Sequence, residues 1–158
     1  MQYREIIYLD SCIIIAWIKN EARPDREMEG VEYCFGRINN NEIKAITSEN
    51  TIGELLPGTF PSGAYDHFMR TVFKRRNFEF VITDRRILFL AQEIRNYYES
   101  LKKIKLSDAI HLATAIHYKA NSFYTFDEKR LLPLNGNVAG YNLLICKPPL
   151  SGQGRLPF

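Results

Sequence analysis

The stretch LSDAIHLATAIH, residues 106–117, organises the whole chain. Four apolar residues recur at the spacing of one helical face: Ala109, Leu112, Ala113 and Ile116. Ser107 is a residue type that caps helices by accepting a hydrogen bond from a free backbone N–H. The pattern predicts a helix that is packed into a core and begins at this cap. Asp108 then lies in the first turn, where the helix dipole favours a carboxylate.

The size and charge of the chain set the first limits. Its 158 residues are 46% hydrophobic and 25% charged, which suits one globular domain with a substantial core. We expect this domain to cover residues 1–146 and a tail rich in Pro and Gly, extended or mobile, to cover residues 147–158. The net charge of +3 permits an anionic partner such as nucleic acid without requiring one.

The cysteines and the start of the chain indicate a cytoplasmic protein. Cys12, Cys34 and Cys146 are far apart and form no close pair, so neither a zinc site nor a disulfide framework is indicated. The first residues lack the pattern of a signal peptide, and the apolar run that follows is shorter than the roughly 20 residues of a membrane span. We therefore expect reduced thiols and no membrane association.

Short β-branched and aromatic runs alternate with helical patterns along the chain. Strands are expected at residues 6–9, 43–47, 78–82 and 122–125, with a fifth within 141–145. Helices are expected at residues 12–19, 30–41, 48–56, 64–76, 84–103 and 106–117, and a loop at 20–29. The inward faces of the helices at 64–76 and 84–103 are expected to include Phe73, Leu88, Tyr97 and Leu101. Strands separated by helices predict the α/β class: a three-layer α/β/α sandwich around a mostly parallel sheet of four or five strands.

Four acids map to one edge of this sheet. Asp10 follows the first strand, Asp127 follows the fourth, and Asp108 opens the helix that leads into the fourth. Glu54 belongs to the helix after the second strand and can turn toward the same edge. Each has an ordinary explanation, as a helix cap, a turn residue or a solvated helix acid. Together they lie where ligands bind in open α/β sheets, beyond the carboxyl ends of the strands.

A cluster of carboxylates indicates a hard divalent cation. Like charges repel one another and burial disfavours ionisation, so such a cluster is costly unless a cation compensates it. Oxygen ligands without thiolates or several imidazoles suit Mg²⁺ or Mn²⁺, which also bind water and phosphate oxygens. This combination of ligands is typical of phosphodiester hydrolysis by metal-activated water.

These motifs resemble those of the PIN-domain ribonucleases, especially the VapC-like toxins of toxin–antitoxin pairs. The resemblance covers residues 6–132 and rests on YLDS (8–11), TIGEL (51–55), LSDAIHLATA (106–115) and YTFD (124–127). It implies that four acids ligate the metal and are catalytic: Asp10, Glu54, Asp108 and Asp127. It further implies that Ser11 and Thr125 place hydroxyls near the metal or phosphate, and that RNA cleavage leaves a 5′-phosphate. A homodimer and a cognate antitoxin protein are the partners that the resemblance implies.

One position departs from the family pattern, and one pair of arginines stands out. These toxins often have Asn two residues after the first Asp, where this chain has Cys12, whose thiol cannot reproduce the hydrogen bonds of an amide. Arg85 and Arg86 lie in the first turn of a predicted helix, where the dipole favours anions, which makes them candidates for phosphate contact.

Other interpretations of the same residues remain open. A PIN-like module that binds nucleic acid or protein without catalysis would carry the same motifs. A receiver-like signalling domain also gathers acids at a sheet edge, but Asp10 has no adjacent acid and Asp108 has no role in that scheme. His111 stands three residues after Asp108 and could act as a ligand or base; we interpret it as a packed, hydrogen-bonded core histidine.

Overall fold

Short apolar runs form a five-stranded sheet in the computed structural model, which describes Tyr3 and residues 5–152. The strands are β1 (Ile6–Leu9), β2 (Lys44–Ser48), β3 (Phe78–Val81), β4 (Ser122–Tyr124) and β5 (Ile145–Cys146). Their spatial order is β3-β2-β1-β4-β5, and every pairing of neighbouring strands is parallel. β1 therefore occupies the centre of the sheet, as a nearly continuous apolar strand that is buried on both faces should.

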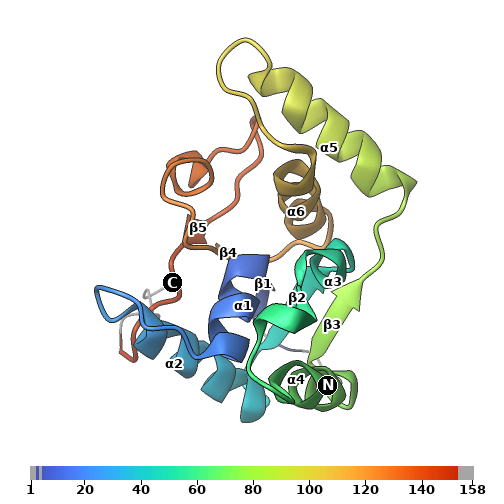
Figure 1. The fold of residues 1–158 in the computed structure, drawn as a ribbon. Coiled ribbons are helices and arrows are strands. Elements are labelled where there is room, and N and C mark those ends of the chain that lie inside the picture. Colours follow the sequence, from blue (N-terminus) through green and yellow to red (C-terminus); the bar gives the residue numbers. More distant parts are fainter. Residues whose placement is uncertain (1–2, 4, 153–158) are drawn as a thin grey trace.

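Helices connect the strands and cover both faces of the sheet (Figure 1). They are α1 (Ser11–Lys19), α2 (Glu27–Asn39), α3 (Asn50–Glu54), α4 (Ala64–Phe73), α5 (Arg85–Tyr98) and α6 (Leu106–His117), with short 3₁₀ turns at Pro57–Thr59 and Leu132–Leu134. The α/β class, the mostly parallel sheet and the order of elements agree with the prediction from sequence.

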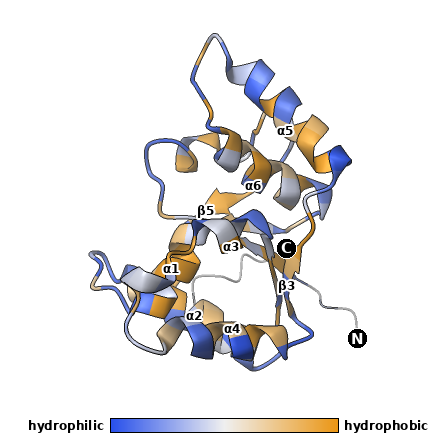
Figure 2. Ribbon diagram, turned by 45° about the vertical axis from the view of Figure 1, so that its right-hand side comes forward, coloured by the Kyte–Doolittle hydropathy of each residue, from blue (hydrophilic) through white to orange (hydrophobic). Residues whose placement is uncertain are grey.

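Two hydrophobic cores lie on opposite faces of the sheet. Tyr8 and Phe123 face the core beneath α5 and α6, whereas Ile7 and Tyr124 face the core beneath α1, α2 and α4. Figure 1 shows these two groups of helices on opposite sides of the strands, and Figure 2 shows α1 and α6 largely in the hydrophobic colour. The three predicted layers are thus helices, sheet and helices.

The strand register places the first and fourth strands for a shared site. Leu9 on β1 pairs with Tyr124 on β4, and the backbone N–H of Asp10 donates to the carbonyl of Tyr124 at 3.0 Å. The residues that follow the two strands, Asp10 and Thr125, consequently emerge side by side at the carboxyl edge of the sheet.

Several details of the helices differ from the prediction. α6 begins at Leu106 with Lys105 as its N-cap, so Ser107 lies inside the first turn and does not cap the helix. α2 begins at Glu27, within the expected loop, α4 ends at Phe73, and α5 ends at Tyr98 rather than near Lys103. Four side chains expected to face inward are exposed: Phe73, Leu88, Tyr97 and Leu101.

The reason for these exposures is helical phase and length. The buried residues of α5 are Ile87, Ala91, Ile94 and Tyr98, which follow one another at steps of three or four. Leu88 and Tyr97 each lie one position off this stripe, while Leu101 lies beyond the last helical residue. An apolar residue close to the stripe in sequence can therefore still point away from the core.

The start of the predicted tail is anchored. Lys147 forms ion pairs with Glu27 at 2.8 Å and with Glu128 at 2.6 Å. Pro148 is buried against Gly30 of α2. Lys147 and Pro148 thus pack against other parts of the fold, the extended or mobile character of the segment stays a prediction, and residues 153–158 lie outside the described part of the chain. In that described part, no helix has the length and apolar character needed to cross a membrane.

Candidate metal site at the carboxyl edge of the sheet

Asp10 is held in a fixed orientation at the end of β1. It is the N-cap of α1, and its Oδ1 accepts a hydrogen bond from the backbone N–H of Ser11 at 2.8 Å. Its Oδ2 accepts the hydroxyl hydrogen of Thr125 at 2.7 Å. The side chain is buried, because the central position of β1 places its carboxyl end beneath α1 and between the neighbouring strand ends. A buried carboxylate with two fixed donors is a rigid oxygen ligand.

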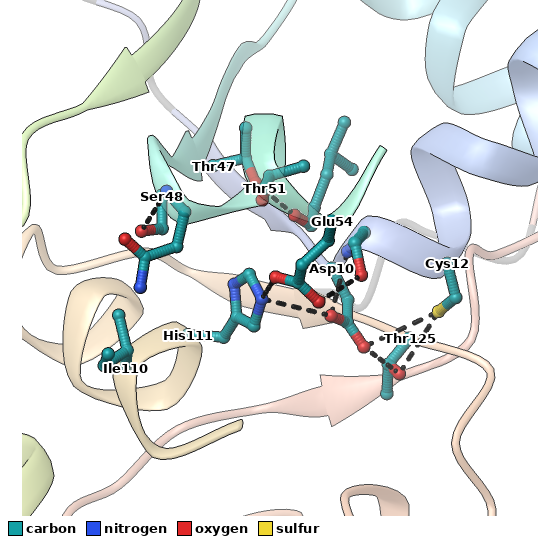
Figure 3. Close-up of polar contacts among 12 residues, drawn as sticks. Asp10, Cys12, Thr47, Ser48, Thr51, Glu54, Ile110, His111 and Thr125 are labelled. Atoms are coloured by element: carbon teal, nitrogen blue, oxygen red, sulfur yellow. Dashed lines mark hydrogen bonds and ion pairs between the residues drawn. The ribbon is translucent and has the colours of Figure 1, made fainter. Parts of the chain in front are cut away.

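Glu54 approaches Asp10 from the last residue of α3. Its Oε2 accepts a hydrogen bond from the Ser11 hydroxyl at 3.1 Å, and its Oε1 lies 2.5 Å from Nε2 of His111 (Figure 3). Burial raises the pKa of Glu54, but the hydrogen bond and charge of His111 and the bond from Ser11 outweigh this, so the pKa lies below its ordinary value. The half-buried Glu54 is therefore ionised and directed inward rather than toward bulk water.

Asp108 and Asp127 complete a group of acids that repel one another. Asp108 lies in the first turn of α6, and burial, followed by the negative charges of Asp10 and Asp127, raises its pKa. Asp127 is partly buried, and its Oδ1 accepts the backbone N–H groups of Lys129 at 3.2 Å and Arg130 at 2.9 Å. Asp127 thus stabilises a turn while its charge acts on Asp108. We call the four carboxylates Asp10, Glu54, Asp108 and Asp127 the acidic edge.

His111 contributes more to this region than the sequence indicated. It is completely buried, as expected for a core histidine, yet its Nε2 contacts Glu54 and its Nδ1 lies 2.5 Å from the hydroxyl of Tyr8. Burial lowers the pKa of His111, but the bond to Glu54 and the charges of Asp10, Glu54 and Asp108 raise it above its ordinary value. The spacing of three residues from Asp108 was the available signal, since residues i and i+3 share a helix face.

Cys12 occupies the place where related toxins often have Asn. Its Sγ lies 3.5 Å from Oδ2 of Asp10 and 3.6 Å from Oγ1 of Thr125, and it accepts the backbone N–H of Phe126 at 3.4 Å. Burial and the charge of Asp10 raise the pKa of the Cys12 thiol far above its ordinary value, so it stays protonated. The thiol therefore links Asp10 to the segment after β4 through long, weak contacts.

The remaining sequence-predicted residues divide into two groups. The hydroxyls of Ser11 and Thr125 lie in the site, where they donate to Glu54 and Asp10. Arg86 forms an ion pair with Asp84 at 2.7 Å, and the described residues show no ion pair between Arg85 or Arg86 and the four acids of the acidic edge. Phosphate contact by these two arginines stays a prediction.

The donors present fit a hard divalent cation. Carboxylate oxygens dominate the acidic edge, and burial together with the charges of Asp10 and Asp127 raises the pKa of Asp108, which a bound cation would offset. Within the described residues, no set of three or more His, Cys, Asp or Glu side chains is arranged so that it could hold a metal ion. Mg²⁺ and Mn²⁺ do not need such a set, because Mg²⁺ binds through one or two carboxylates and retains several waters.

A parallel α/β domain with acids gathered beyond its central strands defines a class of protein suited to cation-assisted phosphate chemistry. The family model of the PIN domain matches residues 7–132, and the chain therefore belongs to the PIN domain family. PIN domains are nuclease domains that generally use divalent metal ions.

Solved structures share the fold. VapBC2 from Rickettsia felis, bound to a promoter DNA fragment, matches with a TM-score of 0.62 at 16% identity over 89% of this chain and 97% of that chain. A toxin–antitoxin complex from Klebsiella pneumoniae matches with a TM-score of 0.58 at 23% identity over 87% and 99%. FitAcB from Neisseria gonorrhoeae matches with a TM-score of 0.59 at 18% identity over 90% and 97%. A comparison with curated protein sequences found no match.

Proposed function

We propose that this PIN domain is a divalent-metal-dependent endoribonuclease and the toxin of a toxin–antitoxin pair that acts in the cytoplasm. The observation that supports the proposal is the acidic edge: Ser11 hydrogen-bonds to both the buried Asp10 and Glu54, and the charges of Asp10 and Asp127 add to burial in raising the pKa of Asp108. Neighbouring carboxylates repel one another, and a cation bound between them would offset this repulsion.

Mg²⁺ or Mn²⁺ would be held by Asp10 and Asp108, with Glu54 and Asp127 as further ligands, directly or through water. When bound, the ion lowers the pKa of its water and offsets negative charge on the scissile phosphate. The protein orients the carboxylates: Thr125 and the Ser11 backbone fix Asp10, and the Ser11 hydroxyl fixes Glu54. Ser11 and Thr125 therefore serve first as orienting groups and only then as candidate contacts for RNA.

A toxin role and an antitoxin partner are supported by the fold that the chain shares with structures solved as toxin–antitoxin complexes. Exposed apolar side chains, among them Phe89 on α5 and Leu101 after it, offer surface for protein contacts, including those of a homodimer.

The direct test is RNA cleavage by the purified chain with added Mg²⁺ or Mn²⁺ and with a chelator. Cleavage is expected only with the metal and should leave 5′-phosphate ends. Asp10→Asn and Asp108→Asn should abolish it while circular dichroism shows an unchanged fold. Asp66→Asn, which changes an exposed acid in the first turn of α4, is the matched control and should cleave normally.

Two outcomes would contradict the proposal. Cleavage by Asp10→Asn and Asp108→Asn at the wild-type rate would show that the activity comes from a contaminant. RNA binding by the wild type without metal-dependent cleavage would favour the catalytically inactive PIN-like module instead.

A further inference from the structure

A chain of hydrogen bonds runs from the core to the acidic edge. It begins at the backbone N–H of Ser48, which donates to the Tyr8 hydroxyl at 2.9 Å. The Tyr8 hydroxyl contacts Nδ1 of His111, and Nε2 of His111 contacts Oε1 of Glu54, each at 2.5 Å. Tyr8 and His111 are both completely buried, so neither exchanges its partner for water. The chain therefore links residues of β2, β1, α6 and α3 in turn, and Figure 3 shows its last contact, between His111 and Glu54.

Counting hydrogens along this chain fixes the direction of each bond. The Tyr8 oxygen accepts from the backbone N–H of Ser48, and its hydroxyl has one hydrogen to donate. In the neutral form of His111, the Nδ1 atom that lies 2.5 Å away accepts this hydrogen and is the unprotonated ring nitrogen. The other ring nitrogen, Nε2, consequently carries the proton and donates it to the Glu54 carboxylate.

We propose that Tyr8 and His111 are positioning residues that hold the Glu54 carboxylate in place for the metal ion, with Tyr8 selecting the Nε2–H tautomer of His111. The inference rests on the proposed metal-dependent function of the acidic edge. Glu54 needs such support because it is the last residue of a five-residue helix, α3, and its only other side-chain donor among the described residues is Ser11. Residues that hydrogen-bond to metal ligands fix the geometry of those ligands. Loss of such a residue typically costs about 10- to 100-fold in metal affinity or activity.

Two substitutions at one position separate the hydrogen bond from the packing. The amide nitrogen of His111→Gln can take the place of Nε2 and donate to Glu54, whereas the amide of His111→Asn takes the place of Nδ1 and leaves Glu54 without this donor. We expect His111→Asn to weaken Mn²⁺ binding, measured by calorimetry, about 10- to 100-fold, and His111→Gln to restore most of the loss. The matched controls are His117→Asn and His117→Gln, which change the last residue of α6. Both variants should bind Mn²⁺ with the affinity of the wild type.

Tyr8→Phe tests the second link with little change in shape. We expect a weaker affinity for Mn²⁺ than in the wild type and a change in the ring-nitrogen signals of His111. In ¹⁵N NMR of the Mg²⁺-loaded wild type, Nδ1 should resonate as an unprotonated nitrogen and Nε2 as a protonated one. Thermal unfolding of every variant identifies any that fail to fold, and the spectrum of the wild type tests the tautomer independently of all variants.

The outcomes distinguish this inference from the proposed function. A wild type that neither binds Mn²⁺ nor cleaves RNA refutes the proposed function. A folded His111→Asn variant with wild-type Mn²⁺ affinity, or equal losses in His111→Asn and His111→Gln, refutes the positioning role while metal-dependent cleavage stands. A protonated Nδ1 refutes the selection of the tautomer by Tyr8.

Discussion

Single residues at the acidic edge serve the fold and the candidate site at once. Asp10 caps α1 and is also the most rigidly held carboxylate of the group. Asp127 accepts two backbone N–H groups in a turn while its charge raises the pKa of Asp108. The structural roles of Asp10 and Asp127 are therefore present in the fold, and their roles as metal ligands stay a prediction beside them. Loss of Asp10 or Asp127 should therefore lower the stability of the protein as well as weaken metal binding, while circular dichroism still reports the same fold.

Asp108 is expected to destabilise the metal-free protein. Its raised pKa means that the folded state disfavours the ionised form, which at neutral pH costs stability through burial and the charges of Asp10 and Asp127. Asp108→Asn should thus unfold at a higher temperature than the wild type without metal. Mg²⁺ at about one hundred times its Kd should stabilise the wild type by about 2.7 kcal/mol and the variant by less.

Thermal unfolding with and without Mg²⁺ measures both effects. Asp66→Asn provides the control for removing an acid from a helix N-terminal turn. A metal-free Asp108→Asn variant that melts below the wild type would show that repulsion is not the dominant effect at this position.

The acids could be located from the sequence more easily than the residues that hold them in place. Asp10 and Asp127 follow strands that are recognisable from their composition, so their shared edge could be predicted. Tyr8 has the appearance of an ordinary core strand residue, and its partner His111 lies 103 positions away. Such a contact depends on how α6 packs over β1, which a single sequence does not encode. The roles of the four acids as metal ligands remain a prediction.

At the scale of the element, Gly30 and Gly36 can be compared directly because both lie inside α2. Glycine inside a helix is about 1 kcal/mol less favourable than alanine. At Gly36 an added Cβ meets no atom within 4 Å, so Gly36→Ala should stabilise the protein by up to about 1 kcal/mol. At Gly30 an added Cβ would lie 2.2 Å from the carbonyl oxygen of Pro148, and Gly30→Ala should destabilise it by about 1–3 kcal/mol.

Urea unfolding of the two variants checks this pair. Because both substitutions carry the same gain in helix propensity, the difference between them isolates the contact with Pro148. Equal stability of the two variants would show that the segment after β5 does not pack on α2 in solution.

Helix boundaries were the least predictable part of the fold. The continuous apolar stripe of α6 predicts this helix correctly, but Ser107 is not its cap, because the helix starts one residue earlier. The apolar pattern that includes Leu101 predicts that α5 reaches Lys103, whereas the chain turns after Tyr98, whose carbonyl accepts the N–H groups of Leu101 and Lys102. Turns closed by backbone hydrogen bonds leave little trace in composition.

At the scale of the molecule, Glu27 ties the start of α2 to the segment that follows β5. Burial raises the pKa of Glu27, but hydrogen bonds and charges from Lys147 and Arg23 outweigh it, so the pKa is lowered in the folded state. A lowered pKa gives stability that is present above the ordinary carboxyl range and is lost as the pH falls through the folded value. Glu27→Gln should therefore cost about 2 kcal/mol at neutral pH, the scale of a hydrogen bond to a charged group.

Denaturant unfolding at neutral and acidic pH measures this dependence. The difference between wild type and Glu27→Gln should shrink as Glu27 becomes protonated at low pH. Glu29→Gln, at a more exposed acid of the same helical turn, is the control. A difference that stays constant across the pH range would contradict an electrostatic origin.

The central place of β1 also has a consequence for protein synthesis. β1 leaves the ribosome first, yet Asp10 meets its partner Thr125 only after another 115 residues have been made. A nascent chain that is abandoned before Ser122 lacks both the fourth acid and β4, one of the two strands that pair with β1. Under the proposed function, unfinished copies are therefore harmless to the RNA of the cell that makes them.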